Sequence, residues 1–238
     1  MESLTLCNLS IGYGRHVVGA QLSARVAVGG VTLLLGRNGC GKSTLLHCLV
    51  GLLPPLAGEV RWDGGALHEC TPQERARRVA FLLTTRPAAE SLTVQDVLDT
   101  ARLPHRGATT PSADRLVTLR AAQRCGVADW LSRPLRTLSD GQVQWVMLAR
   151  VLAQDPPLLL LDEPTAHLDL PGKRALFALL LNLAREEGRT IIASTHDLLP
   201  ICHEVSAWWL LHEGRLQCGS PTNTRLRQTV GEVLETVV

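Results

Sequence analysis

A glycine-rich segment between a predicted strand and a predicted helix constrains this chain more than any other feature. Apolar residues 31–35 precede the segment, and a helical pattern at residues 45–50 follows it. Strand, glycine loop, lysine, hydroxyl and helix is the order of a phosphate-binding loop. An ordinary glycine turn, the alternative, needs neither the lysine nor the hydroxyl. The segment consists of Gly36, Arg37, Asn38, Gly39, Cys40, Gly41, Lys42, Ser43 and Thr44.

The residue types in this segment predict how it would hold a nucleoside triphosphate. Glycines let backbone N–H groups turn toward the β- and γ-phosphates, at a helix N-terminus whose partial positive charge favours an anion. Lys42 adds a full charge near the bridge between these phosphates, and the Ser43 hydroxyl is placed to bind Mg²⁺. We therefore expect the whole segment to bind nucleotide.

The composition narrows the class of protein. With 238 residues and a formal net charge of +2, the chain can form one large α/β domain or two joined lobes. Its near-neutrality gives no support for a nucleic-acid partner. Seven scattered cysteines without a C-x-x-C pair are typical of reduced cytosolic thiols. Neither a signal peptide nor an apolar run of roughly 20 residues is present, so we expect a soluble protein.

Hydrophobic patterns predict a parallel sheet wrapped by helices. Loose alternation over residues 3–28 indicates short antiparallel strands. Residues 93–131 are helical in pattern, interrupted by a loop at residues 105–112, and we expect them to form an inserted helical lobe. The other predicted elements are strands at 59–65, 79–83, 158–161 and 190–194 and helices at 143–153 and 173–187.

Two acids end the apolar strand at residues 158–161. Asp162 and Glu163 would lie at the carboxyl edge of the sheet, beside the phosphate-binding loop. Asp162 can hold Mg²⁺ through its water shell, and Glu163 can act as general base toward a water that attacks the γ-phosphate. The alternative is a strand that simply ends in solvated acids, and the phosphate-binding loop in the same chain argues against it.

Three further motifs carry a resemblance to the ATP-binding-cassette (ABC) family. Residues 139–142 (Ser-Asp-Gly-Gln), which alone would be an anion-binding helix cap, resemble its signature loop, usually Leu-Ser-Gly-Gly-Gln. Residues 165–169 (Thr-Ala-His-Leu-Asp) resemble its D-loop, and residues 194–197 (Ser-Thr-His-Asp) its switch histidine. The phosphate-binding loop and residues 158–163 then correspond to Walker A and Walker B. The resemblance covers nearly the whole chain, in the family's order of motifs.

The resemblance implies a fold and the remaining site residues. The fold is an α/β P-loop NTPase (RecA-like) core with an antiparallel β lobe, about residues 1–86 and 151–238, and a helical subdomain, about residues 87–150, in a single ABC ATPase domain. Tyr13, otherwise a packing residue, would stack on adenine, and His196 would hydrogen-bond the γ-phosphate and the attacking water. The implied ATP contacts outside Walker A are Tyr13, Ser139, Gly141, Gln142 and Asp169; the catalytic residues are Glu163, His196 and Lys42.

The resemblance also implies partners. In this family the signature loop completes the site of a second copy, so two ATP molecules lie between head-to-tail subunits, and ATP favours the closed state. A lone cassette with nothing after it for a regulatory domain resembles the energy subunit of a bacterial-type importer. The histidine at position 167 resembles the iron–siderophore, haem and cobalamin subgroup. Two multi-span permeases would each insert a short helix near residues 84–92. The chain would then lie peripherally at the cytoplasmic face of the inner membrane. An extracytoplasmic solute-binding protein would be an indirect partner.

The chain departs from the family pattern at three positions. Thr84 stands where a glutamine usually reaches Mg²⁺ and the membrane partner, which predicts either a weaker metal contact through its hydroxyl or altered coupling between hydrolysis and that partner. Asp140 replaces a signature glycine, and because a phosphate would repel its carboxylate we expect it to cap the helix or point away. Cys40 lies beside Lys42 at a helix terminus, which predicts a lowered thiol pKa and a reactive thiol that ATP protects.

Three alternatives stay open on the sequence. One is a soluble ABC ATPase that acts on ribosomes, DNA or an assembly complex, although such proteins usually carry two cassettes or a long coiled coil. A second is a scaffold that binds ATP without turnover, which Thr84 and Asp140 would favour and Glu163 and His196 oppose. The third is transport of another small solute, or export with a separate membrane subunit.

Overall fold

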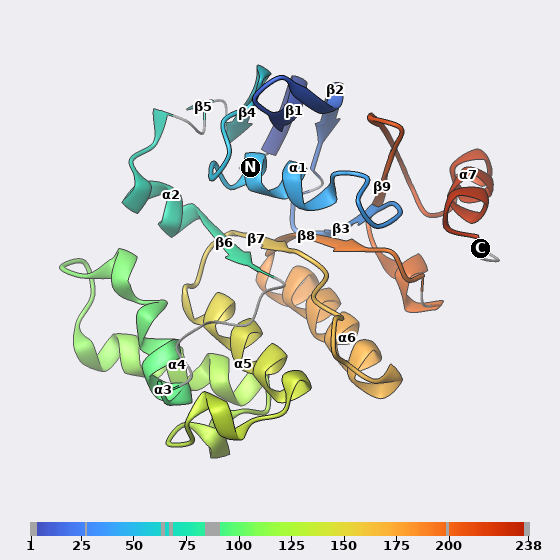
Figure 1. The fold of residues 1–238 in the computed structure, drawn as a ribbon. Helices are drawn as coiled ribbons and strands as arrows, with labels where there is room; N and C mark the ends of the chain where they lie inside the picture. The colour runs from blue at the N-terminus through green and yellow to red at the C-terminus, as the bar shows by residue number, and fades with distance from the viewer. Residues whose placement is uncertain are drawn as a thin grey trace.

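Two β-sheets organise the molecule (Figure 1). The computed structural model describes residues 4–26, 28–62, 65–66, 69–83, 91–198 and 200–235. The larger sheet has the strand order β10-β9-β3-β8-β7-β6, and all neighbouring strands are parallel except the β9–β10 pair. Its strands are β3 (Val31–Leu35), β6 (Val79–Leu82), β7 (Leu158–Leu161), β8 (Thr190–Thr195), β9 (Ala207–His212) and β10 (Arg215–Gly219).

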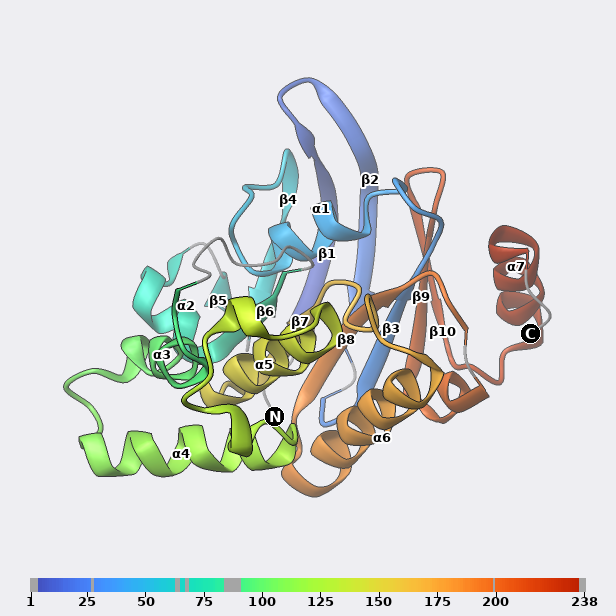
Figure 2. The ribbon, with the colours of Figure 1, turned by 60° about the horizontal axis from the view of Figure 1, so that its bottom comes forward.

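The smaller sheet is antiparallel, as the alternation near the N-terminus predicts. Its order is β2-β1-β4-β5, and β1 and β2 form a long hairpin that Figure 2 shows extending beyond the rest of the molecule. The strands are β1 (Leu4–Tyr13), β2 (His16–Arg25), β4 (Ala57–Trp62) and β5 (Gly65–Ala66).

Helices cover both faces of the larger sheet, and the side chains of β3 show how. Leu34 points into a cluster with α1 (Lys42–Leu49) and the smaller sheet, so α1 lies between the two sheets. Leu33 and Leu35 point the other way, toward α5 (Asp140–Ala153) and α6 (Leu170–Glu187). Burial on both faces explains why these strands are continuous apolar runs.

The remaining helices lie at the two ends of this arrangement (Figures 1 and 2). α3 (Val94–Thr100) and α4 (Pro111–Arg124) pack beside α5, α2 (Pro72–Arg78) leads into β6, and α7 (Thr224–Leu234) follows β10. Short 3₁₀ helices span Leu103–His105, Ala128–Trp130, Leu135–Thr137 and Pro200–Glu204. Among the described residues, none of the helices has the length and apolar character that a membrane span requires.

Three predicted boundaries were wrong, each because of a local capping signal. The loop predicted at residues 105–112 is shorter, since Thr110 caps α4 and Pro111 occupies its first position. The helix predicted from residue 143 begins at Asp140, after the cap Ser139. The helix predicted from residue 173 begins at Leu170, after the cap Asp169.

Candidate functional site

The first turn of α1 differs from that of every other described α-helix. Its N-cap is Gly41, with φ 107°, and no side chain caps the turn. A Cβ at Gly41 would also lie 2.3 Å from a Val18 methyl carbon, so this position requires glycine. The other helices are capped by Thr71, Thr93, Thr110, Ser139, Asp169 and Asn223. The N–H groups that begin α1 are therefore available to an anion.

Lys42 turns its ammonium group into the loop that precedes α1. The side chain is 6% exposed, and Nζ donates hydrogen bonds to the carbonyl oxygens of Gly36 at 2.8 Å and Arg37 at 3.2 Å. Glu163 Oε1 lies 3.3 Å from the same nitrogen. Walker A and Walker B thus meet through one ion pair, as the sequence predicts for the edge of a parallel sheet.

Ser194 holds the two acids of the Walker B strand in place. Its hydroxyl donates to Asp162 Oδ1 at 2.7 Å and accepts the Glu163 N–H at 2.8 Å. Glu163 adopts φ 45°, in the left-handed region that favours glycine. Buried Gln144, on α5, donates to the carbonyl of Pro164 at 2.8 Å. The turn that carries Glu163 is therefore fixed from β8 and from α5.

His196 connects Glu163 to a second charged pair. His196 Nδ1 lies 3.0 Å from Glu163 Oε2, and Nε2 lies 3.7 Å from Asp197 Oδ1. Asp197 Oδ2 accepts a hydrogen bond from Lys173 Nζ at 2.6 Å, and this bond lowers the pKa of Asp197. The chain of contacts runs from Lys42 through Glu163, His196 and Asp197 to Lys173.

These groups line an open cavity of about 410 Å³. Asn38 of the phosphate-binding loop and residues 165–168 of the D-loop also line it. None of the described residues that line the cavity belongs to the signature loop. The cavity thus joins the phosphate-binding loop, the general-base candidate Glu163 and the switch histidine.

The oxygen donors at this edge suit Mg²⁺. Ser43 is exposed in the first turn of α1, and Asp162 is a buried carboxylate. Within the described part of the chain, no cluster of three or more histidine, cysteine or acidic side chains could hold a metal ion. Mg²⁺ needs no such cluster, because it keeps several waters and binds one or two protein oxygens together with substrate phosphates. Thr84, the third predicted metal residue, lies outside the described residues.

The signature loop forms a closed capping box at the start of α5. The Ser139 hydroxyl accepts the Gln142 N–H at 3.3 Å, and the Gln142 side-chain oxygen accepts the Ser139 N–H at 3.0 Å. Of the two alternatives predicted for Asp140, capping the helix is excluded, because Ser139 is the N-cap; Asp140 is the first helical residue and is exposed. A Cβ on Gly141 would lie 3.0 Å from the His167 carbonyl oxygen, so the signature loop packs directly on the D-loop.

The other predicted ATP contacts are placed on the surface or take structural roles. Tyr13 ends β1 and is 53% exposed; its stacking on adenine stays a prediction. Asp169 caps α6 by accepting the Gly172 N–H at 2.8 Å. Arg37 donates to the carbonyl of Val233 at 2.7 Å and pairs with Glu235, so the loop is tied to the end of α7.

The predicted lowering of the Cys40 thiol pKa was wrong. Burial raises the pKa of the Cys40 thiol above its ordinary value, and this effect exceeds the lowering effects of Lys42 and of nearby backbone hydrogen bonds. The thiol is half-buried beside Gly36, where a Cβ would lie 2.6 Å from Sγ. Cys40 is thus a packing residue of the loop at neutral pH.

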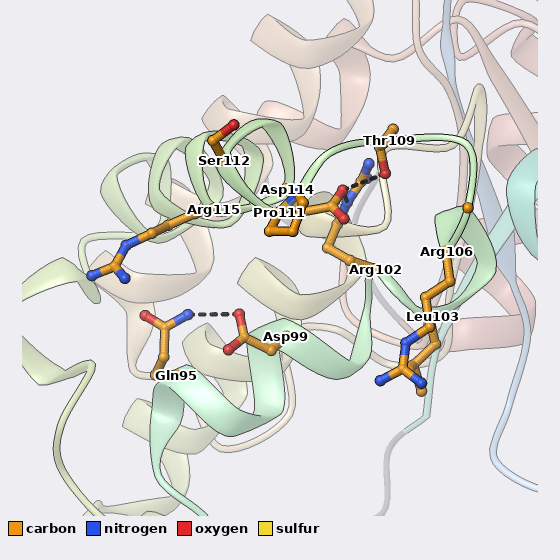
Figure 3. A pocket seen from close by; sticks show the side chains of 11 residues that line it. Gln95, Asp99, Arg102, Leu103, Arg106, Thr109, Pro111, Ser112, Asp114 and Arg115 are labelled. Carbon is orange, nitrogen blue, oxygen red and sulfur yellow. Dashed lines mark hydrogen bonds and ion pairs between the residues drawn. The ribbon is translucent and has the colours of Figure 1, made fainter.

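A second cavity, of about 630 Å³, lies in the helical part of the chain (Figure 3). The Asp114 carboxylate accepts from Arg102 Nε at 2.8 Å and from the Thr109 hydroxyl at 2.9 Å. Arg102 also donates to the carbonyl of Ala153 at 3.0 Å. These contacts join the ends of α3 and α5 to the start of α4, which indicates a structural brace.

Comparison with known proteins agrees with this geometry. Residues 20–166 match the family model described as ABC transporter. The chain belongs to the ABC transporter family. The predicted P-loop NTPase fold and ABC-type ATPase activity are thereby confirmed.

Two relatives and one solved structure illustrate the similarity. The iron(3+)-hydroxamate import ATP-binding protein FhuC of Bacillus subtilis is 39% identical, over 83% of this chain and 74% of its own length. The ferric enterobactin transport ATP-binding protein FepC of Escherichia coli is 37% identical, over 87% of this chain and 78% of its own. A dimeric post-hydrolysis structure of the ATP-binding cassette MJ0796, bound to ADP and Pi, has a TM-score of 0.80 at 25% identity, over 92% of this chain and 99% of that one.

Sequence reasoning missed three residues of this network. Ser194 and Asp197 flank the switch histidine, but nothing in the motif shows that one holds Asp162 and the other Lys173. Lys173 carried a usable signal, because only two of the chain's 24 lysine and arginine residues are lysines, Lys42 and Lys173.

Proposed function

We propose that this chain is the ATP-hydrolysing, energy-coupling subunit of a membrane importer for iron–siderophore, haem or cobalamin-type complexes. The observation that carries the proposal is the contact chain Lys42–Glu163–His196 beside the uncapped start of α1. A scaffold without turnover would need neither the Glu163 carboxylate nor the histidine. The network therefore favours hydrolysis over binding alone.

In this proposal each residue of the network acts on the γ-phosphate or its water. Lys42 and the N–H groups of α1 hold the phosphates. Glu163 takes the proton of the attacking water, and His196 donates a hydrogen bond where negative charge develops. Ser43 and Asp162 would hold Mg²⁺, which neutralises phosphate charge when bound.

We infer that the signature loop acts on the nucleotide of a second copy. Ser139 and Gln142 use their capping groups on each other, yet the Ser139 hydroxyl proton stays free to donate to a phosphate. None of the described residues lining the cavity of about 410 Å³ comes from this loop. The dimeric MJ0796 structure, bound to ADP and Pi, supports a dimer of this chain; its head-to-tail arrangement is part of the proposal.

The permease would dock on an apolar cavity of about 270 Å³ between the larger sheet and the helical part. Leu83, 44% exposed, lies at its mouth. The described lining residues are Phe81, Leu83, Leu92, Val97, Thr100, Met147 and Arg150. This lining would accept an apolar helix, which supports a peripheral location at the cytoplasmic face of the inner membrane.

The relatives support the class of solute but not its identity. FhuC is named for iron(3+)-hydroxamate and FepC for ferric enterobactin, although their identities to this chain are 39% and 37%. Cassettes of similar sequence thus serve different siderophores. The permease and an extracytoplasmic solute-binding protein would select the solute.

Purification from native membranes tests the importer proposal. The tagged chain, extracted in mild detergent, should co-elute with a multi-span permease in equal amount by mass spectrometry. Leu83→Glu should lose the permease because it places a charge in the apolar cavity. Leu116→Glu is the matched control: Leu116 lies on α4, is 48% exposed, and its replacement should leave the permease bound. Ribosomal or other soluble partners without a membrane protein would overturn the importer and favour a soluble ABC ATPase.

A further inference from the structure

The chain uses arginine for nearly all of its positive charge. Of its 24 lysine and arginine residues, only Lys42 and Lys173 are lysines. Lys42 belongs to the phosphate-binding loop, and Lys173 lines the same cavity as Glu163 and His196. Both lysines of the chain therefore lie at one site, although they are far apart in the sequence.

Lys173 reaches this site through Asp197. Its Nζ donates to Asp197 Oδ2 at 2.6 Å, with the two side chains 24% and 42% exposed. The other oxygen, Oδ1, lies 3.7 Å from His196 Nε2, while His196 Nδ1 lies 3.0 Å from Glu163 Oε2. The imidazole of His196 is thus placed between two carboxylates, and Lys173 holds the outer one.

We propose that Lys173 is a positioning residue for hydrolysis: by holding Asp197, it sets the orientation of His196 and balances the outer carboxylate charge. The proposal rests on the roles of Glu163 and His196 in the proposed function. Without Lys173, the Asp197 carboxylate is free to rotate onto Nε2 and draw the ring away from Glu163. Loss of Lys173 would also leave the negative charge of Asp197 uncompensated beside the cavity that receives the γ-phosphate in the proposed function.

A purely structural role explains Lys173 less well. It lies near the start of α6, where the helix dipole disfavours a cation, so helix stability gives no reason for it. A second ion pair, Arg185–Glu204 at 3.3 Å, already joins α6 to the segment after β8.

Three variants separate positioning from anchoring and from direct phosphate contact. Lys173→Met should lower kcat by about tenfold, because a small misplacement of a reacting group is costly. Its affinity for MgATP, measured by equilibrium binding, should stay unchanged. Lys173→Arg should keep most of the parental kcat, since arginine keeps the positive charge. Arg174→Met removes an exposed charge one residue further on and should behave as the parent.

Coupling to Asp197 gives the sharpest test. If Lys173 acts through this carboxylate, Lys173→Met/Asp197→Asn should lose no more activity than the worse single variant. Multiplied losses would contradict the proposal. So would a parental kcat in Lys173→Met, failure of Lys173→Arg to restore activity, or weakened MgATP binding in Lys173→Met, which would indicate a direct phosphate contact.

Two controls keep this inference separate from the proposed function. Thermal unfolding of each variant shows whether a loss of activity reflects a loss of fold, and Lys173→Arg remains informative if Lys173→Met is unstable. His196→Ala should abolish turnover; if it does not, the proposed role of His196 fails. If His196→Ala is inactive and Lys173→Met is fully active, only the role of Lys173 fails.

Discussion

Two helix starts in this molecule bear on phosphate binding, and they are built in opposite ways. α1 begins at Gly41 without a capping side chain, and Lys42 adds a charge beside its free N–H groups. α5 begins in a closed capping box, in which Ser139 and Gln142 satisfy each other. In the first, Lys42 and the uncapped N–H groups lie together within one chain, whereas in the second two capping groups bond to each other and the Ser139 hydroxyl proton stays available.

This difference supports the proposal that the chain carries two halves of different sites. The start of α1 lies in a network with Glu163 and His196. In the proposed function this helix start holds the triphosphate that these two residues help to hydrolyse. The start of α5 packs on the D-loop through Gly141. In the proposed function, this self-capped helix start closes over a nucleotide that another copy holds, and turnover then requires a dimer.

The largest expected effect separates binding from hydrolysis at the α1 site. Glu163→Gln should lower multiple-turnover hydrolysis by at least about a hundredfold, because it removes the general base. Binding of MgATP should persist, since Lys42 and the N–H groups of α1 remain. Phosphate release and equilibrium binding measure the two quantities, and undiminished turnover would show that another group is the base.

A second, smaller effect tests the α5 site. Ser139→Ala should lower kcat by about tenfold, because it removes the hydroxyl that donates to the phosphate. It should also cost about 1 kcal/mol of stability through loss of the cap. Thr93→Ala removes the cap of a similar box on α3 and is the matched control. Equal losses of kcat in both variants would reduce Ser139 to a structural cap.

The smallest effect concerns the electrostatic field at the start of α1. Because burial raises the pKa of the Cys40 thiol above its ordinary value, this thiol should stay protonated at neutral pH and react slowly with iodoacetamide. Alkylation should accelerate about tenfold per pH unit as pH rises toward that pKa. Peptide mass spectrometry measures this rate; rapid labelling at pH 7 would mean that Lys42 and the helix start outweigh burial after all.

The parts of the site that follow one strand were predictable from sequence, whereas those that join strands were not. Gly36 and Asp162 each follow an apolar run, so their place at one sheet edge could be inferred. The division at about residues 87 and 150 stays a prediction. Strand β9 went unpredicted, although its apolar residues 207–211 carried the pattern of a buried strand.

Tertiary packing explains the errors at single residues. The pKa of Cys40 depends on how the loop folds over the thiol, and local sequence shows only the opposing charge of Lys42. The Lys173–Asp197 pair joins α6 to the segment after β8, and no helical spacing rule covers such a pair. The cap of α5, by contrast, depends on local sequence: Ser139 rather than Asp140 caps the helix because Gln142 follows Ser139 by three residues.

Sedimentation of the chain with MgATP tests most directly the claim that the α1 and α5 starts act on nucleotides of different copies. Glu163→Gln should become a dimer that holds two ATP molecules. Adding Ser139→Arg, which fills the space at the α5 start, should leave monomers that each still bind one ATP. If the double variant dimerises as before, or if its monomers no longer bind ATP, the two helix starts do not divide the work between copies as described.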